Sequence, residues 1–239
     1  MIDWWHSYCG PAPRPGTWAS QWNFDPALLG ALAFGAIASI AMLSGVRRRA
    51  GLAAVGILAI AFVSPLCGLT TALFAARAVH HVLLVTIVAP LLAIAVPAQR
   101  GLGATPALMV STAVLWSWHL PTLYDAALGN VGIYWAMQAA LVAGAWAFWS
   151  AIRSAAPTEA TIGLVGGAIQ MGFLGALLTF ATRPLYAAHL ATTVPFGIGP
   201  LADQQYAGLV MWVPGMLPYA IAVAWIARAR WRTMAGATT

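Results

Sequence analysis

The clearest shortage in this sequence is charge. Only 7% of its 239 residues are charged, whereas 62% are hydrophobic. Soluble domains carry about 25% charged and 45–50% apolar residues, so the composition excludes an ordinary soluble domain. Segments that are apolar on every face have no surface to present to water, and they are typical of helices inside a membrane. The composition therefore predicts an all-α, polytopic membrane protein.

Residues for several common chemistries are also scarce. The two cysteines, Cys9 and Cys67, are too few for a disulfide framework. They could form one disulfide, bind copper or do neither, and the sequence alone leaves these options equal. CxxC, HExxH, Walker-loop and GxGxxG motifs are absent, and no acidic pair lies inside an apolar stretch. We therefore expect neither an enzyme nor a proton pump. The first 25 residues also lack the basic and apolar regions of a cleavable signal peptide.

What the sequence does contain is a series of long apolar stretches. A membrane-spanning helix needs about 20 apolar residues, and seven stretches qualify. They cover residues 26–45, 51–69, 78–96, 105–118, 131–152, 161–180 and 205–226. Asp25 followed by Pro26 is typical of a helix N-cap and first helical position. We predict an N-terminal periplasmic segment (1–25), a seven-helix transmembrane domain (26–227) and a cytoplasmic tail (228–239).

The basic residues are all arginine, and they are unevenly placed. Eight arginines follow the first, third and fifth stretches or lie in the C-terminal tail, whereas the opposite side holds three. Because basic residues concentrate on the cytoplasmic side, the N-terminus is predicted outside and the C-terminus in the cytoplasm of a bacterial inner membrane. The net charge of +6 does not predict nucleic-acid binding, because the arginines stand singly or in short clusters at helix ends.

All five histidines fall on the predicted outer side, His6 in the N-terminal segment and the others near helix ends. Imidazole binds copper and zinc, together with carboxylate, thiolate or thioether ligands. The candidate metal ligands at this face are His80, His81, His119, His189 and Asp203. Two structural interpretations stay open, because interfacial histidines often bond only to headgroups or helix ends, and Asp203 is placed to cap its own helix. The methionines Met171, Met211 and Met216 are typical packing residues, with thioether ligation of copper(I) as the alternative.

Three longer stretches carry a family resemblance. They are residues 80–92 (HHVLLVTIVAPLL), 116–128 (WSWHLPTLYDAAL) and 203–215 (DQQYAGLVMWVPG). These stretches resemble the polytopic CtaG family of cytochrome c oxidase assembly factors. The resemblance implies a seven-span protein that helps to assemble a heme–copper oxidase, with delivery of copper as its usual proposed role. Many members have histidines early in the fifth span, where this chain has Tyr134, Trp135 and Gln138.

The main functional prediction is therefore an assembly factor that binds copper transiently at the periplasmic membrane face. His119 and either His80 or His81 would be ligands, and Asp203 would orient one of them. The implied partners are a cytochrome c oxidase subunit, a periplasmic copper chaperone and the lipid bilayer. Two alternatives stay open: a transporter of copper or another small cation, and a heme-binding redox membrane protein, because histidines on facing helices can also be heme ligands.

Overall fold

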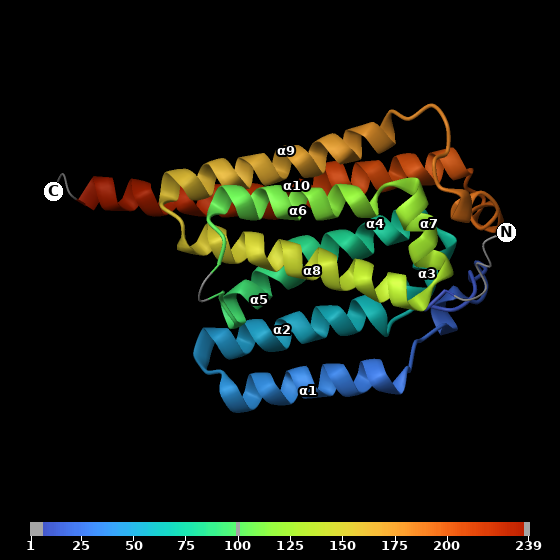
Figure 1. Ribbon diagram of the computed structural model, residues 1–239, viewed down its shortest axis with the longest axis horizontal. Coiled ribbons are helices and arrows are strands. Elements are labelled where there is room, and N and C mark those ends of the chain that lie inside the picture. Colours follow the sequence, from blue (N-terminus) through green and yellow to red (C-terminus); the bar gives the residue numbers. More distant parts are fainter. Residues whose placement is uncertain (1–6, 99–100, 237–239) are drawn as a thin grey trace.

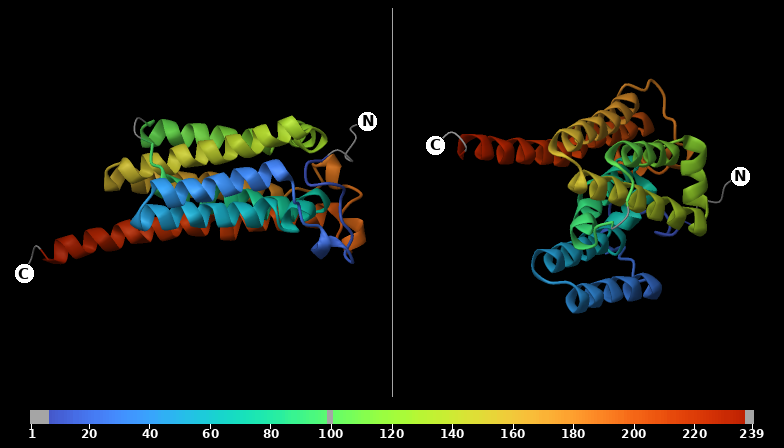
Figure 2. Two further views of the ribbon diagram at one scale, coloured as in Figure 1. Left: turned by 90° about the horizontal axis from the view of Figure 1, so that it is seen from below. Right: turned by 60° about the vertical axis from the view of Figure 1, so that its left-hand side comes forward.

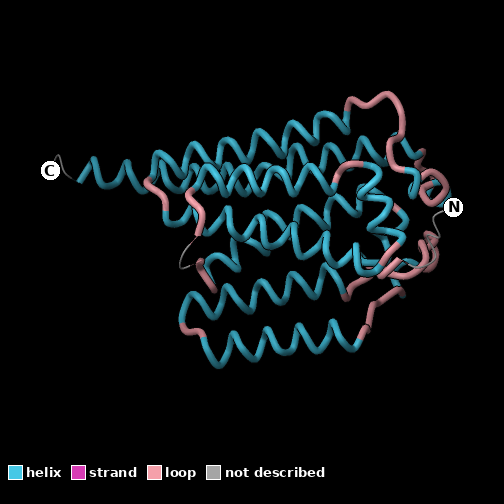
Figure 3. Tube along the Cα trace, viewed as in Figure 1, coloured by secondary structure: helices cyan, strands magenta, loops and turns pink. Residues whose placement is uncertain are grey.

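The computed structural model describes residues 7–98 and 101–236, and all regular structure within these ranges is helical (Figure 1). The long helices lie side by side along one direction, and the connecting loops gather at the two ends of the bundle (Figure 3). The prediction of an all-α protein is confirmed.

The helices follow the predicted apolar stretches, with additional short helices between them. In chain order they are η2 (Trp18–Ser20), α1 (Pro26–Met42), α2 (Gly45–Phe62), α3 (Leu66–Ala72), α4 (Phe74–Leu83), η3 (Leu84–Val88), α5 (Ala89–Ala95), α6 (Ala104–Trp118), α7 (Pro121–Gly129), α8 (Val131–Ser154), α9 (Pro157–Thr179), η4 (Ala187–His189), η5 (Val194–Phe196) and α10 (Pro200–Gly236). Asp25 caps α1 as predicted, because its carboxylate accepts a hydrogen bond of 2.8 Å from the amide of Ala27.

In the described residues, four helices are long and apolar enough to cross a membrane: the continuous α4–η3–α5 helix, α8, α9 and α10. The pair α2 and α3, bent by 45°, provides a fifth candidate. Helix α1 is apolar but has 17 residues, and α6 has 15. The structure thus supports four or five spans, and the number seven stays a prediction.

The second predicted span differs most from the observed helices. The helix α2 begins at Gly45, so Arg47 and Arg48 lie in its first turns rather than in a loop. It ends at Phe62, and Pro65 precedes the start of α3. A proline cannot donate its backbone nitrogen and its ring clashes with the carbonyl four residues earlier, which accounts for the break at this point.

The third predicted span is continuous across Pro90 because the helix widens there. Residues Leu84–Val88 form the π-helical segment η3 directly before α5. In this register the carbonyl of Val85 would need the amide that Pro90 lacks. The indole nitrogen of Trp149 in α8 donates to that carbonyl instead, at 3.0 Å. Neighbouring helices thus satisfy the carbonyl that a membrane proline leaves free.

The two C-terminal helices form the closest pair in the bundle. A β-carbon added at Gly175 in α9 would lie 2.7 Å from the carbonyl oxygen of Gly208 in α10. The two backbones therefore touch where neither residue has a side chain, as is common between membrane helices. The 37 residues of α10 extend about 55 Å, farther than the bilayer core of about 30 Å, and its C-terminal part projects beyond the bundle (Figure 2).

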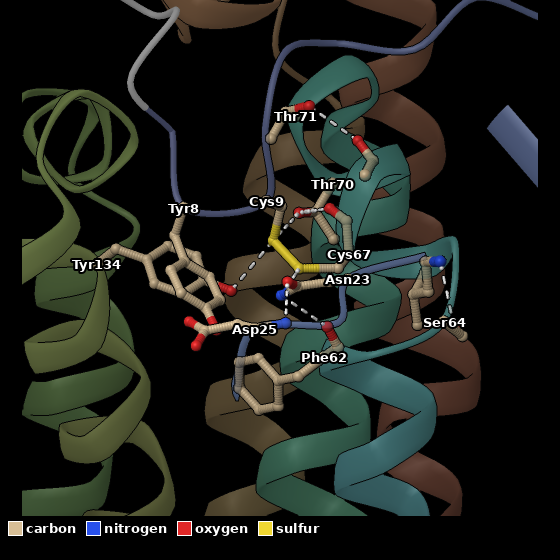
Figure 4. Close-up of a disulfide and its surroundings, with 12 residues drawn as sticks. Tyr8, Cys9, Asn23, Asp25, Phe62, Ser64, Cys67, Thr70, Thr71 and Tyr134 are labelled. Atoms are coloured by element: carbon tan, nitrogen blue, oxygen red, sulfur yellow. Dashed lines mark hydrogen bonds between the residues drawn. A yellow bond between two sulfur atoms is a disulfide. The ribbon is translucent and has the colours of Figure 1, made fainter. Parts of the chain in front are cut away.

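A disulfide fastens the N-terminal segment to the bundle. Cys9 pairs with Cys67 in α3, with Cα atoms 5.3 Å apart (Figure 4). The preceding Tyr8 stacks on Tyr134 of α8 at a centroid distance of 5.1 Å, and its hydroxyl donates to Asp25 at 2.8 Å. Of the three options that the sequence left open for the cysteines, the structure contains the disulfide.

Candidate metal centre

The position of the first two candidate ligands is set by the start of α4. The helical structure is interrupted at Leu73, whose backbone is extended, and α4 begins at Phe74. The carboxylate of Asp203, from α10, accepts hydrogen bonds from the amides of Phe74 at 2.6 Å and of Ala75 at 3.1 Å. It therefore caps α4, not its own helix as the sequence suggested. This cap fixes the direction in which α4 presents His80 and His81.

His81 and His119 approach each other from different helices. Their ring centroids are 5.5 Å apart with an interplanar angle of 80°, and the side chains are only 2% and 5% exposed. The ring of His80 lies 5.9 Å from that of His81, but its edge contact with Phe62 at 4.7 Å is closer. The structure thus brings His81 and His119 together, with His80 as their neighbour.

The hydrogen bonding of His119 leaves one ring nitrogen free. Its Nδ1 lies 2.7 Å from the carbonyl oxygen of Leu115, which can only accept, so Nδ1 carries the proton. In the neutral ring the lone pair is then on Nε2, for which the described residues offer no hydrogen-bond partner. Metal-bound histidines commonly donate their second nitrogen to a carbonyl in this way. The hydroxyl of Tyr186 also donates to the backbone oxygen of His119, at 2.9 Å.

Other buried polar atoms also lack a hydrogen-bond partner among the described residues. They include both ring nitrogens of His80 and of His81 and, in α8, the side-chain amide of Gln138. Buried polar groups in folded proteins are nearly always hydrogen-bonded, so each unpaired one calls for an explanation, such as a bound water or ion. Arg77 itself is fully buried, with its guanidinium 5.3 Å from the ring centre of Tyr134.

The environment of His189 is different, because both of its ring nitrogens have partners. Nδ1 donates to the carbonyl of Ala72 at 3.4 Å, and Nε2 accepts from the hydroxyl of Tyr124 at 2.7 Å. Burial, reinforced by the positive charge of Arg77, lowers the pKa of His189 to about 3. Burial likewise raises the pKa of Tyr124. This imidazole therefore stays neutral and joins the loop after α9 to the end of α3.

The five candidate ligands do not form one cluster. In the described parts of the chain, no three side chains of histidine, cysteine, aspartate or glutamate are placed to hold a single metal ion. His6 lies outside the described residues. The geometry gives Asp203 and His189 hydrogen-bonding roles, and a direct contact of either with metal stays a prediction.

Two buried residues, Arg77 and Gln138, were not predicted as site residues from the sequence, although Gln138 was named as a position where many members of the family have histidine. Arg77 was counted only as a loop arginine, although it precedes His81 by four residues and so lies on the same face of α4. Gln138 is a polar residue in an otherwise apolar helix, one turn after Tyr134. The spacing of Arg77 and the polarity of Gln138 are the signals that could have identified them.

More than half of this chain matches a known protein family. The family model described as cytochrome c oxidase caa3 assembly factor (Caa3_CtaG) matches residues 104–233, more than half of the sequence. The chain belongs to this family. The Caa3_CtaG match includes His119, His189 and Asp203, whereas His80 and His81 in α4 precede it. Searches of curated proteins and of solved structures gave no match.

Membership of the Caa3_CtaG family confirms the predicted resemblance. It supports a membrane protein that takes part in cytochrome c oxidase assembly and that therefore interacts with this oxidase. Family membership does not by itself show copper binding, and it gives no support to the cation-transporter or heme-carrier alternatives.

Proposed function

We propose that this Caa3_CtaG protein binds copper transiently, as cargo, between His81 and His119 and passes it to a cytochrome c oxidase subunit. The observation that carries the proposal is the state of His119: its Nδ1 is fixed on the carbonyl of Leu115, its Nε2 has no partner among the described residues, and its ring centroid lies 5.5 Å from that of His81. His80 is a neighbouring ligand that an ion could recruit after its ring turns away from Phe62.

The energetics of burial support this assignment. Each buried polar group that lacks a hydrogen bond costs roughly 1–3 kcal/mol of stability. The imidazoles of His80, His81 and His119 together contain five such nitrogens among the described residues. A neutral imidazole has one lone pair, so a metal ion could satisfy one nitrogen of each ring and recover part of this cost. A carrier that must release its cargo also needs few ligands, which agrees with a pair rather than a closed four-ligand site.

The proposed topology has seven spans, with the histidine end in the periplasm and the C-terminus in the cytoplasm. The disulfide Cys9–Cys67 supports this orientation, because disulfides persist in oxidising compartments such as the bacterial periplasm. The arginines Arg47 and Arg48 lie at the opposite end, where their side chains donate to the carbonyls of Ala95 and Leu43. In this arrangement α1 and α6 are the two spans that are short for a bilayer core.

The proposed partners follow from the location of the copper pair. A cytochrome c oxidase subunit would be contacted laterally within the bilayer of the inner membrane. A soluble periplasmic copper chaperone would deliver the ion at the end of the bundle. Both steps need access from the end that carries the N-terminal segment, which the disulfide holds against α3 and α8.

The test is a deletion strain complemented with wild-type protein, with His119→Ala or with His189→Ala. We expect loss of oxidase activity in the deletion strain, partial recovery on added copper, and full recovery with wild-type protein. His119→Ala should be present in the membrane at normal amount but should fail to restore activity. His189→Ala, compared at an equal amount of protein in the membrane, is the matched control, because it removes a buried imidazole whose two nitrogens are already bonded.

Normal oxidase copper content with His119→Ala would contradict the proposal. Purified protein separates the alternatives: a Soret band would identify a heme carrier, and copper uptake into vesicles would identify a transporter. Bound copper without heme and without uptake is the result expected here.

A further inference from the structure

We propose that the copper pair selects copper(I) over divalent cations, and that the buried Arg77 is the residue that imposes this choice. The inference rests on the proposed function, because it names the charge state of the cargo held by His81 and His119. It goes beyond that function because a copper carrier could equally hold copper(II).

The first support is the fixed positive charge of Arg77. Its side chain is completely buried, and a guanidinium stays protonated in proteins. One of its nitrogens donates to the carbonyl of Thr70 at 3.3 Å, and the guanidinium also interacts with the hydroxyls of Tyr124 and Tyr134. The buried carboxylate of Asp203 forms no ion pair with Arg77 in the described residues, and its oxygens instead accept from the amides at the start of α4.

The second support is the closeness of this charge to the imidazole pair. Arg77 and His81 are separated by four residues of α4, so their side chains are neighbours on one helix face. The field of Arg77 also reaches His189, whose pKa it helps to lower. Repulsion in a buried site is far stronger than in water and grows with the charge of the ion. A divalent ion therefore meets twice the repulsion that copper(I) meets.

The third support is the small number of ligands and their lack of charge. Zinc prefers four ligands, and copper(II) prefers four or more nitrogen and oxygen ligands. The described residues provide no group of three histidine, cysteine, aspartate or glutamate side chains for one ion. The cysteines are joined in the disulfide, so they supply no thiolate. Copper(I), with a filled d shell, is stable between two neutral imidazoles.

The experiment uses the full-length protein, purified in detergent, and compares three metals by equilibrium competition with chelators. Copper(I) is titrated without oxygen, and copper(II) and zinc(II) are titrated separately. Wild-type protein should retain one copper(I) per chain and should not retain copper(II) or zinc(II) at the same free concentration. His119→Ala should lose the copper(I).

The role of Arg77 is tested with Arg77→Met, which keeps the side-chain length and removes the charge. Affinity for zinc(II) and copper(II) should rise by about tenfold relative to the change for copper(I). The matched control is Arg183→Met, which removes the same charge from an exposed position in the loop after α9, at the same end of the bundle, and should leave all three affinities unchanged.

The possible failures are distinguishable. If wild-type protein retains zinc(II) or copper(II) as well as copper(I), and His119→Ala loses them, the selectivity is overturned while the proposed function stands. If no copper of either charge is retained, the proposed function fails. If Arg77→Met changed the affinities for all three metals equally, Arg77 would not be the source of the selectivity. Should that variant not fold, the wild-type comparison alone decides whether the site selects copper(I).

Discussion

Two polar regions lie at the same end of this bundle, and both are buried. Around His189 and Asp203 the polar atoms are paired: the imidazole bonds to Tyr124 and Ala72, and the carboxylate caps α4. Around His81 and His119, five ring nitrogens, counting those of the adjacent His80, have no partner among the described residues.

The contrast separates residues that hold the fold from residues available to a ligand. A paired buried group contributes to stability, and its removal leaves a partner unsatisfied. A buried group without a protein partner costs stability unless a ligand or water satisfies it, so its presence needs another explanation. Substitutions in the paired region should therefore lower stability most, and substitutions in the unpaired region least.

Replacing Asp203 by alanine should have the largest effect on folding. It leaves the amides of Phe74 and Ala75 buried without an acceptor, each at a cost of about 1–3 kcal/mol, so we expect a loss of about 2–6 kcal/mol. Asp203→Asn, which keeps one acceptor oxygen, should lose less. Thermal unfolding in detergent measures both. Equal stability of Asp203→Ala and wild type would mean that this cap does not hold α4.

Removing the disulfide should cause the second-largest loss of stability. The double variant Cys9→Ser with Cys67→Ser frees the N-terminal segment, and we expect a loss of about 2–4 kcal/mol. The readouts are the melting temperature and cleavage of the N-terminal segment by protease. Wild-type protein treated with reductant should behave like the variant. An unchanged melting temperature in both would contradict the proposed tether.

His189 should make stability depend on pH. Its pKa is about 3 in the folded protein and about 6.5 in the unfolded chain, so below pH 6.5 only the unfolded chain takes up this proton. Stability should therefore fall as the pH drops from 6.5, by at most about 1.4 kcal/mol per pH unit from this group. His189→Gln should flatten the profile by one proton. A profile identical to that of wild type would show that His189 does not titrate in this range.

His81→Leu should have the smallest effect on stability. Both ring nitrogens of His81 lack partners, so an apolar side chain of similar size should be neutral or slightly stabilising. Copper binding should nevertheless be lost. A loss of stability as large as that of Asp203→Ala would show that the imidazole is structural, and the contrast between the two regions would disappear.

Much of the fold could be predicted from the sequence, because apolar length and arginine placement are local signals. Helices were expected at each of the seven stretches, and Asp25 with Pro26 marked the start of α1 correctly. The break between α2 and α3 was missed, since the apolar run continues through Pro65. The π-helical segment before Pro90 depends on Trp149, which is distant in sequence and therefore gave no local signal.

The candidate site was harder to predict because it depends on contacts between helices. The sequence placed the histidines at one depth but could not tell which rings meet, and helix direction brings His81 to His119 while His189 turns to Tyr124. Asp203 was expected at its own helix terminus, yet its carboxylate crosses to α4. The pairing of Cys9 with Cys67 also could not be predicted without the fold, because the two residues are 58 positions apart in the sequence.

The most direct test of the central claim is X-ray absorption at the copper edge of the copper-loaded protein. The account predicts a first shell of imidazole nitrogen only, which persists in His189→Ala and is lost in His119→Ala. A first shell of sulfur or of oxygen alone, or a spectrum altered by His189→Ala but not by His119→Ala, would contradict it.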